Sequence, residues 1–212
     1  MGNWSPGTSA RREYERLHAD YEATLLRERR FIGSLLLKLQ DDPLRTRAWE
    51  RGASGERIVG ARLDKLDGIA VLHDRRIPGT RTDIDHIAIG PGGVYVIDAK
   101  LYGGMVRHRR ADHLRRDRRV SIEGDERAKL VARMRTQVSA ITRALVETPI
   151  PVTAAICFVD AEWPEPARPF TLDGIWVGWP EVLPDLVTRP GLLDDHAMAT
   201  AGGLLDSRLP PA

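Results

Sequence analysis

Residues 82–100 constrain the fold of this chain more than any other stretch. They read TDIDHIAIGPGGVYVIDAK, which is two apolar runs on either side of a glycine-rich segment. Apolar runs of this length, bounded by glycine and proline, predict β-strands over 84–89 and 94–100 that are joined by a tight turn. The sequence therefore predicts a largely apolar antiparallel hairpin.

The register of this hairpin brings charged side chains together. If Ile89 pairs with Val94, then Asp85 lies opposite Asp98. Because side chains alternate along a strand, Asp85, Asp98 and Lys100 share one face of the sheet. Opposed like charges repel, and strands this apolar need compensation for such a pair. A divalent cation between the carboxylates, with a lysine beside them, would compensate and would suit phosphodiester cleavage.

The composition places limits on the class of protein. A chain of 212 residues, 23.7 kDa and net charge +2 suits one core of about 100–150 residues plus an extension. No apolar run approaches the roughly 20 residues that span a bilayer, and the N-terminus lacks the order of a secretory signal. Cys157 is the only cysteine, which excludes an intrachain disulfide, and its apolar neighbours predict a buried residue. We expect no membrane contact and a cytoplasmic location.

Periodic apolar residues predict the elements around the hairpin. Those over 11–40 indicate a long N-terminal helix that docks on the body or provides a partner surface. The other expected elements are helices over 54–66 and 127–146, strands over 69–73, 152–159 and 175–179, and helical turns over 180–187 and 192–205. This order predicts an α/β domain with a mixed β-sheet flanked by helices. We divide the chain into an N-terminal tail and helical extension (1–49), a core (50–160) and a C-terminal strand and helical segment packed on it (161–212).

The helix expected over 54–66 carries a candidate site residue. Ser54 can cap this helix, which would put Glu56 in the first turn and on the side of the apolar stripe. A glutamate there favours the helix dipole, so a purely structural role is one interpretation. The other is a carboxylate that reaches toward the hairpin.

Two further polar residues occupy positions that need partners. Gln137 lies within or beside the apolar stripe of its helix, where an amide must be hydrogen-bonded. His86 follows Asp85 directly, so it faces the opposite side of the strand, beside Ile97. We expect a buried, hydrogen-bonded histidine that supports the sheet and is not a metal ligand.

A basic stretch follows the hairpin. Residues 107–135 contain 11 Lys and Arg against 5 Asp and Glu, although the whole chain is close to neutral. Such a surplus is either a solvated surface or a surface that contacts phosphates. The residues that we expect to bind nucleic acid are Arg107, Arg109, Arg110, Arg115, Arg116, Arg118 and Arg119.

These residues suit metal-assisted hydrolysis of a phosphodiester. Mg²⁺ prefers carboxylate and water ligands, which Asp85 and Asp98 would provide, with Mn²⁺ as an alternative ion. Glu56 would complete the metal shell or hold a water. Lys100 would orient or activate the attacking water and stabilise the developing charge. Gln137 would position Lys100 or contact DNA.

The same residues resemble the nuclease-related domain (NERD) family, a branch of the PD-(D/E)XK nuclease superfamily. The motifs that carry the resemblance are Gly55-Glu56, Ile84-Asp85-His86, Val96-Ile97-Asp98-Ala99-Lys100 and Gln137, within about residues 50–160. Asp98 stands where the family more often has glutamate, which shortens the reach to a metal by one methylene. The resemblance implies a restriction-endonuclease-like mixed sheet flanked by helices, and Mg²⁺-dependent cleavage of nucleic acid.

We therefore expect a Mg²⁺-dependent nuclease that acts on DNA, with RNA as a substrate left open. Two alternatives stay open: a catalytically silent nucleic-acid-binding module, and an interaction protein that uses its N-terminal helix. The sequence does not distinguish single-stranded, duplex or branched substrates. Sequence specificity, a homodimer and a required protein partner are equally open.

Overall fold

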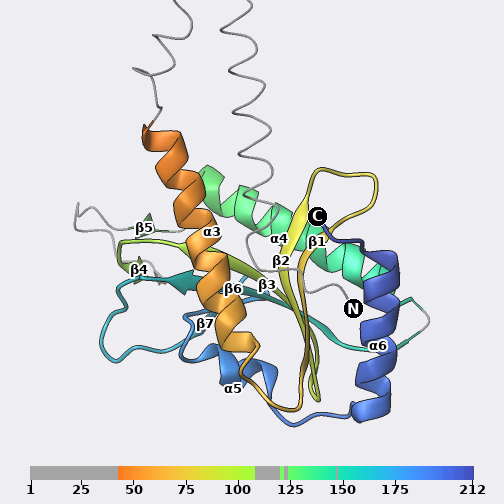
Figure 1. The fold of residues 1–212 in the computed structure, drawn as a ribbon. Helices are drawn as coiled ribbons and strands as arrows, with labels where there is room; N and C mark the ends of the chain where they lie inside the picture. Colours follow the sequence, from red (N-terminus) through yellow and green to blue (C-terminus); the bar gives the residue numbers. More distant parts are fainter. Residues whose placement is uncertain (1–42, 108–119, 122–123, 147) are drawn as a thin grey trace, which may run out of the picture.

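The computed structural model describes residues 43–107, 120–121, 124–146 and 148–212 (Figure 1). The long helix predicted over 11–40 lies outside these residues. None of the helices in the described part of the chain is long and apolar enough to cross a membrane.

The described residues form both helices and strands, as expected for an α/β domain. The helices are α3 (Pro43–Leu63), α4 (Gly124–Ala144), α5 (Leu183–Val187) and α6 (Asp195–Arg208). The strands are β1 (Ala70–Arg76), β2 (Asp83–Gly90), β3 (Gly93–Leu101), β4 (Val106–Arg107), β5 (Val120–Ser121), β6 (Val152–Val159), β7 (Phe170–Leu172) and β8 (Ile175–Gly178).

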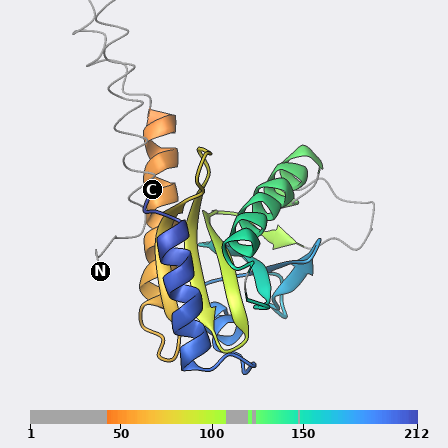
Figure 2. The same cartoon turned by 90° about the vertical axis from the view of Figure 1, so that its right-hand side faces the viewer.

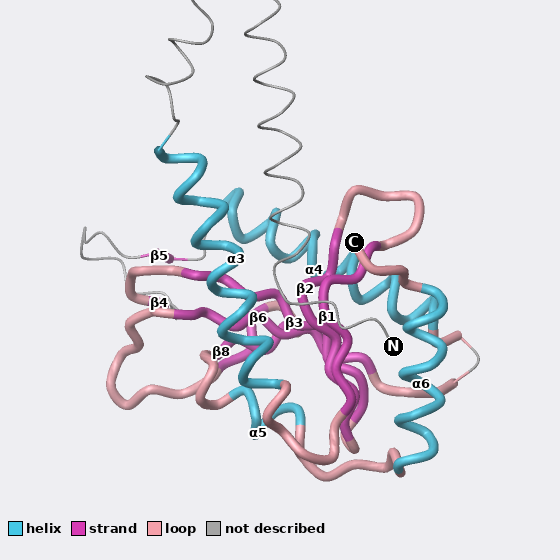
Figure 3. The backbone as a smooth tube through the Cα atoms, in the orientation of Figure 1, coloured by secondary structure: helices cyan, strands magenta, loops and turns pink. Residues whose placement is uncertain are grey.

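The sheet is mixed, as predicted. Its strand order is β1-β2-β3-β6-β8-β7. The pairs β1–β2, β2–β3 and β7–β8 are antiparallel, whereas β3–β6 and β6–β8 are parallel. The parallel strand β6 is covered on both faces, which explains its nearly continuous apolar sequence. The short pair β4–β5 lies beside this sheet, on the side away from α6 (Figure 3).

The hairpin register agrees with the prediction from the sequence. Ile89 pairs with Val94, and pairing continues to His86 and Ile97. Asp85 and Asp98 are the next residues beyond this last pair. In the turn, Gly93 has a φ of +134°, and a Cβ there would lie 2.5 Å from the Pro151 carbonyl oxygen. Only glycine fits this position, so the turn residue helps to hold the register.

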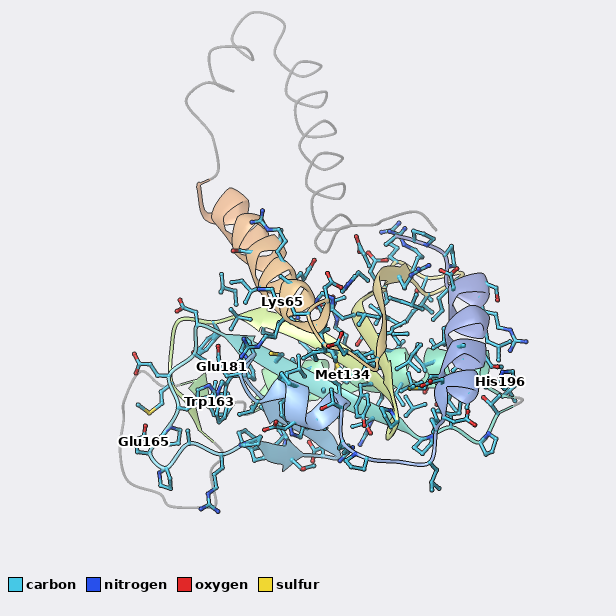
Figure 4. All side chains as sticks on the ribbon, turned by 60° about the horizontal axis from the view of Figure 1, so that its bottom comes forward. Lys65, Met134, Trp163, Glu165, Glu181 and His196 are labelled. Carbon is cyan, nitrogen blue, oxygen red and sulfur yellow. The ribbon has the colours of Figure 1, made fainter. Side chains whose placement is uncertain are left out.

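Helices cover both faces of the sheet. Figure 2 shows α3 and α4 on opposite sides of the strands. Ile87 and Ile89 belong to the core beneath α4 and α6, whereas Ala88 belongs to the core beneath α3 and α5. Met134 of α4, labelled in Figure 4, lies deep in the first of these cores and is 1% exposed. The alternation of side chains along β2 thus supplies both cores.

The helix predicted over 54–66 begins earlier than expected. Helix α3 starts at Pro43, where proline is tolerated because the first helical N–H groups have no intrahelical acceptor. Ser54 is therefore interior and not a cap, and Glu56 is not in the first turn. The helix-dipole interpretation of Glu56 is wrong for this reason. Gly55 packs against β3, where a Cβ would lie 3.1 Å from the backbone nitrogen of Leu101.

The C-terminal residues complete the sheet and cover its edge. The predicted strand over 175–179 is confirmed as β8, while the three-residue β7 was not predicted. Asp194 caps α6 by accepting a hydrogen bond from the backbone N–H of Ala197. The chain then runs along β1, where Arg76 N–H donates to the Pro210 carbonyl. This contact shields part of an otherwise open sheet edge.

Candidate active site

The structure brings the three charged residues of the hairpin together. Asp85 and Asp98 are buried on the face that α4 covers, with 9% and 0% exposure. The Lys100 ammonium lies 2.7 Å from the Asp98 Oδ2, and its side chain is 33% exposed. Lys100 thus connects a fully buried carboxylate with the molecular surface.

The carboxylate of Asp85 is held by the backbone of β3. The Ala99 N–H donates a hydrogen bond of 2.9 Å to its Oδ2. The pKa of Asp85 is raised to about 7, chiefly by burial and next by the charge of Asp98, although Lys100, Arg133 and the Ala99 N–H act in the opposite direction. Asp85 is therefore a fixed carboxyl group that exchanges its proton near neutral pH.

Arg133 is a site residue that sequence analysis missed. It lies on α4, with its Nη2 3.5 Å from Asp85 Oδ1 and its Nε 3.3 Å from Asp98 Oδ1. Burial lowers its pKa, but Asp98, Asp85 and Glu56 together more than offset this, and the pKa is raised. Its spacing from Gln137 could have identified it, because a residue four positions before Gln137 lies on the same side of α4.

Asp98 retains unused capacity to accept hydrogen bonds. Both of its carboxylate oxygens are buried, and neither has a well-oriented hydrogen bond within the described part of the chain. The two cations nearby are close enough for ion pairing, but they do not satisfy the geometry of a hydrogen bond. Buried carboxylates normally have such partners, so this one has room for another ligand.

Glu56 reaches the same electrostatic environment from α3. Its pKa is raised to about 8, chiefly by burial and next by the charges of Asp85 and Asp74, while Lys100 acts in the opposite direction. Asp74, on β1, was not identified from the sequence. It is 2% exposed and has a left-handed backbone with φ of 55°. The charges of three aspartates, Asp85, Asp74 and Asp98, thus all raise the pKa of Glu56.

The metal set expected from the sequence is only partly assembled. In the described ranges, no group of three His, Cys, Asp or Glu side chains is arranged to hold a metal ion. Glu56 therefore does not join Asp85 and Asp98 as a third ligand here. The chemistry still fits a hard divalent cation, because the donors are carboxylate oxygens and those of Asp98 are buried without hydrogen bonds from the described residues.

Gln137 has a different neighbour from those expected. Its side chain is fully buried, and its Nε2 donates a hydrogen bond of 2.9 Å to the Asp83 carbonyl. A side chain with 0% exposure does not face a nucleic acid, and its hydrogen bond goes to β2, not to Lys100. Gln137 thus ties α4 to the start of the strand that carries Asp85.

His86 is buried on the opposite face, which confirms the prediction. It pairs with Ile97 and is 0% exposed. Its Nδ1 shares a 2.8 Å hydrogen bond with the Nδ1 of His73, whose Nε2 lies 2.9 Å from Asp64 Oδ1. The pKa of His86 is lowered to about 3, chiefly by burial and next by the neighbouring His73. His86 is therefore neutral, and its partner His73 was not recognised from the sequence.

The basic surface predicted from the sequence is mostly outside the described residues. The backbone of Arg107 is in β4, but its side chain belongs to the part of the chain that is not described. Arg109, Arg110, Arg115, Arg116, Arg118 and Arg119 all lie in the undescribed segment 108–119. Their contact with nucleic acid stays a prediction.

The mixed sheet, with an Asp-x-Lys strand end beside a second aspartate, is the arrangement of a nuclease-like protein. The model of the nuclease-related domain family matches residues 51–159, and the chain belongs to this family. The family is part of the PD-(D/E)XK-like nuclease superfamily. A Bacillus anthracis protein described as uncharacterized is 39% identical over 61 residues, which cover 26% of this chain and 29% of that relative. No solved structure matches the chain.

Proposed function

We propose that this protein is a Mg²⁺-dependent nuclease that hydrolyses phosphodiester bonds in DNA. The observation that carries the proposal is the convergence of Asp85, Asp98 and Lys100 at one buried strand end that opens to the surface through Lys100. The nuclease-related family of the chain supports the same chemistry.

Asp85 and Asp98 would hold the divalent cation, with Glu56 acting on it through its charge or through a water. When bound, such an ion lowers the pKa of water and neutralises charge on phosphoryl oxygens. The protein contributes the placement of the donors. The Ala99 N–H orients Asp85, and Gln137 secures the start of its strand. Both contacts keep the carboxylate aimed at Asp98.

Lys100 acts on the reacting groups. Its ammonium is anchored 2.7 Å from Asp98 and is partly exposed, so it can reach the phosphate of a bound strand. In hydrolysis, a water oxygen forms a bond to phosphorus while the ester oxygen leaves and takes up a proton. Lys100 would orient the water and stabilise the negative charge that develops on the phosphoryl oxygens.

A cleavage assay tests this proposal. Plasmid, linear duplex and single-stranded DNA, with an RNA strand beside them, are incubated with the protein in Mg²⁺, Mn²⁺ or EDTA. The Asp98→Ala variant serves as the control. Cleavage that requires the metal and disappears in the variant is the expected result, and the preferred substrate form emerges from the same gels. Metal-independent cleavage, or equal cleavage by the variant, would overturn the proposal.

A binding module without catalysis is the second candidate, and one observation favours it. Asp98 already has two cations close to it, Lys100 and Arg133, so the site is neutralised without a metal. A silent module would bind DNA in EDTA, with an affinity that falls steeply with salt, and would not cleave it under any metal condition.

A further inference from the structure

Arg133 lies between the two carboxylates of the hairpin. Its guanidinium approaches Asp85 at 3.5 Å and Asp98 at 3.3 Å, and it does so through different nitrogens. A cation that bridges two carboxylates carries out the electrostatic task that the sequence assigns to a divalent ion. The position of Arg133 therefore bears on how a metal enters this site.

The contacts of Arg133 are those of an exchangeable partner. Strong charge-assisted hydrogen bonds are about 2.7–2.9 Å long, and both Arg133 contacts are longer. The 2.7 Å contact between Lys100 and Asp98 is within that range. The Arg133 side chain is also 43% exposed, although Asp98 is fully buried. It can therefore move into solvent while the carboxylates stay in place.

We propose that Arg133 is an internal counter-ion that occupies the cation position of the metal-free site, and that a divalent metal displaces it. This inference rests on the proposed function. It makes Arg133 a positioning residue that sets the affinity for metal, because binding includes the cost of breaking two ion pairs.

A second arginine on the same helix provides a matched control for the loss of charge at Arg133. Arg135 lies two residues further along α4, on a different side, and it is exposed. Replacing either arginine with glutamine removes one positive charge from α4. Only the change at position 133 removes the competitor from the carboxylates, whereas both alter the general field of the helix.

The test measures Mn²⁺ binding by calorimetry in wild type, Arg133→Gln and Arg135→Gln at one pH above about 8, where fewer protons compete for the carboxyl groups of Asp85 and Glu56. Two partly exposed ion pairs predict about fivefold tighter binding by Arg133→Gln and little change for Arg135→Gln. Unchanged or weaker binding by Arg133→Gln would overturn the inference alone. No binding of metal to any of the three proteins would overturn the proposed function as well.

A second measurement uses the wild-type protein, so it does not depend on the folding of a variant. Phenylglyoxal modifies accessible arginines, and peptide mass spectrometry reports each one separately. We expect the modification of Arg133 to rise on addition of Mn²⁺, while that of Arg135 stays constant. Modification of Arg133 that does not change with bound Mn²⁺ would show that the metal does not displace it, and would overturn the inference.

Discussion

Asp85 and His86 are consecutive residues of β2, and both are buried titratable groups, yet they have different surroundings. The His86 side chain lies on the α3 face, in a chain of contacts through His73 to Asp64. The Asp85 side chain lies on the α4 face, where it accepts hydrogen bonds from the backbone N–H of Ala99 and from the guanidinium of Arg133. One strand therefore presents a structural group and a candidate catalytic group at adjacent positions.

The difference between them lies in the partners and not in the burial. Burial, followed by the neighbouring His73, keeps His86 neutral with a pKa of about 3. The charge of Asp85 is balanced by a partly exposed arginine, and its pKa of about 7 leaves it poised between two protonation states. A buried titratable residue is thus a candidate functional residue when a ligand can replace one of its partners.

The largest effect should follow from changes on the α4 face. Asp98→Asn or Lys100→Met should lower DNA cleavage by about 10²–10⁴-fold. The first change removes a carboxylate donor to the metal, and the second removes the positive charge that stabilises the reacting phosphate. Initial rates on DNA measure the loss, and circular dichroism checks that the fold is intact. A folded variant with wild-type rates would show that Asp98 or Lys100 is not catalytic, and would contradict the assignment of catalysis to the α4 face.

On the α3 face, His86→Gln should affect stability instead of chemistry. The change leaves the His73 Nδ1 without its partner in a buried position, which should cost about 1–3 kcal/mol in the free energy of unfolding. Cleavage by the folded protein should stay within about threefold of wild type. Urea unfolding and cleavage rates below the transition separate the two effects. A large fall in rate without loss of stability would place His86 in the catalytic machinery.

The same variant should reveal the titration of His86. The folded state depresses its pKa to about 3 from an ordinary 6.5, so the stability that the neutral ring provides is present above pH 6.5 and is lost as pH falls toward 3. The deficit of His86→Gln relative to wild type should therefore shrink on acidification, by up to about 1.4 kcal/mol per pH unit. Unfolding curves at a series of pH values test this, and a constant deficit would argue against a neutral buried histidine.

Metal binding should depend on pH because two carboxyl groups of the candidate site, those of Asp85 on β2 and Glu56 on α3, hold protons near neutral pH. Asp85 and Glu56 have pKa values raised to about 7 and about 8, so both are largely protonated below pH 7 in the metal-free protein. Metal must then displace protons, and apparent Mn²⁺ affinity should rise by up to about tenfold per pH unit for each proton released. Calorimetry in buffers of different ionisation enthalpy counts those protons. Affinity that does not vary across this range would mean that neither carboxyl group joins the metal site.

The smallest expected effect concerns the support of β2. Gln137→Leu removes the hydrogen bond to the Asp83 carbonyl, but it also removes a buried Oε1 that has no partner within the described residues. These terms partly cancel, so we expect a loss of about 1 kcal/mol in stability. Thermal unfolding measures this loss, with cleavage rates recorded in parallel. A rate loss as large as that of Asp98→Asn would show that Gln137 acts on the substrate.

Local patterns were sufficient to predict much of this fold. The hairpin register followed from alternation and from the glycine-rich turn, and the strand over 152–159 was confirmed as β6. The start of α3 was not predicted, because Ser54 is a good cap but Pro43 is equally acceptable at a helix start. Local propensity cannot decide between two acceptable helix boundaries.

The placement of Asp85, Asp98 and Lys100 on one face followed from the sequence alone, since side chains on paired strands alternate with a period of two. Which side chains from other elements reach this site depends on the packing of the helices and strands. Arg133, which contacts Asp85 and Asp98, belongs to α4, and Asp74, whose charge acts on Glu56, belongs to β1. Neither contact follows from strand pairing within the hairpin. Helix and strand periodicity specify which way a side chain points, whereas the packing of distant elements specifies what it touches.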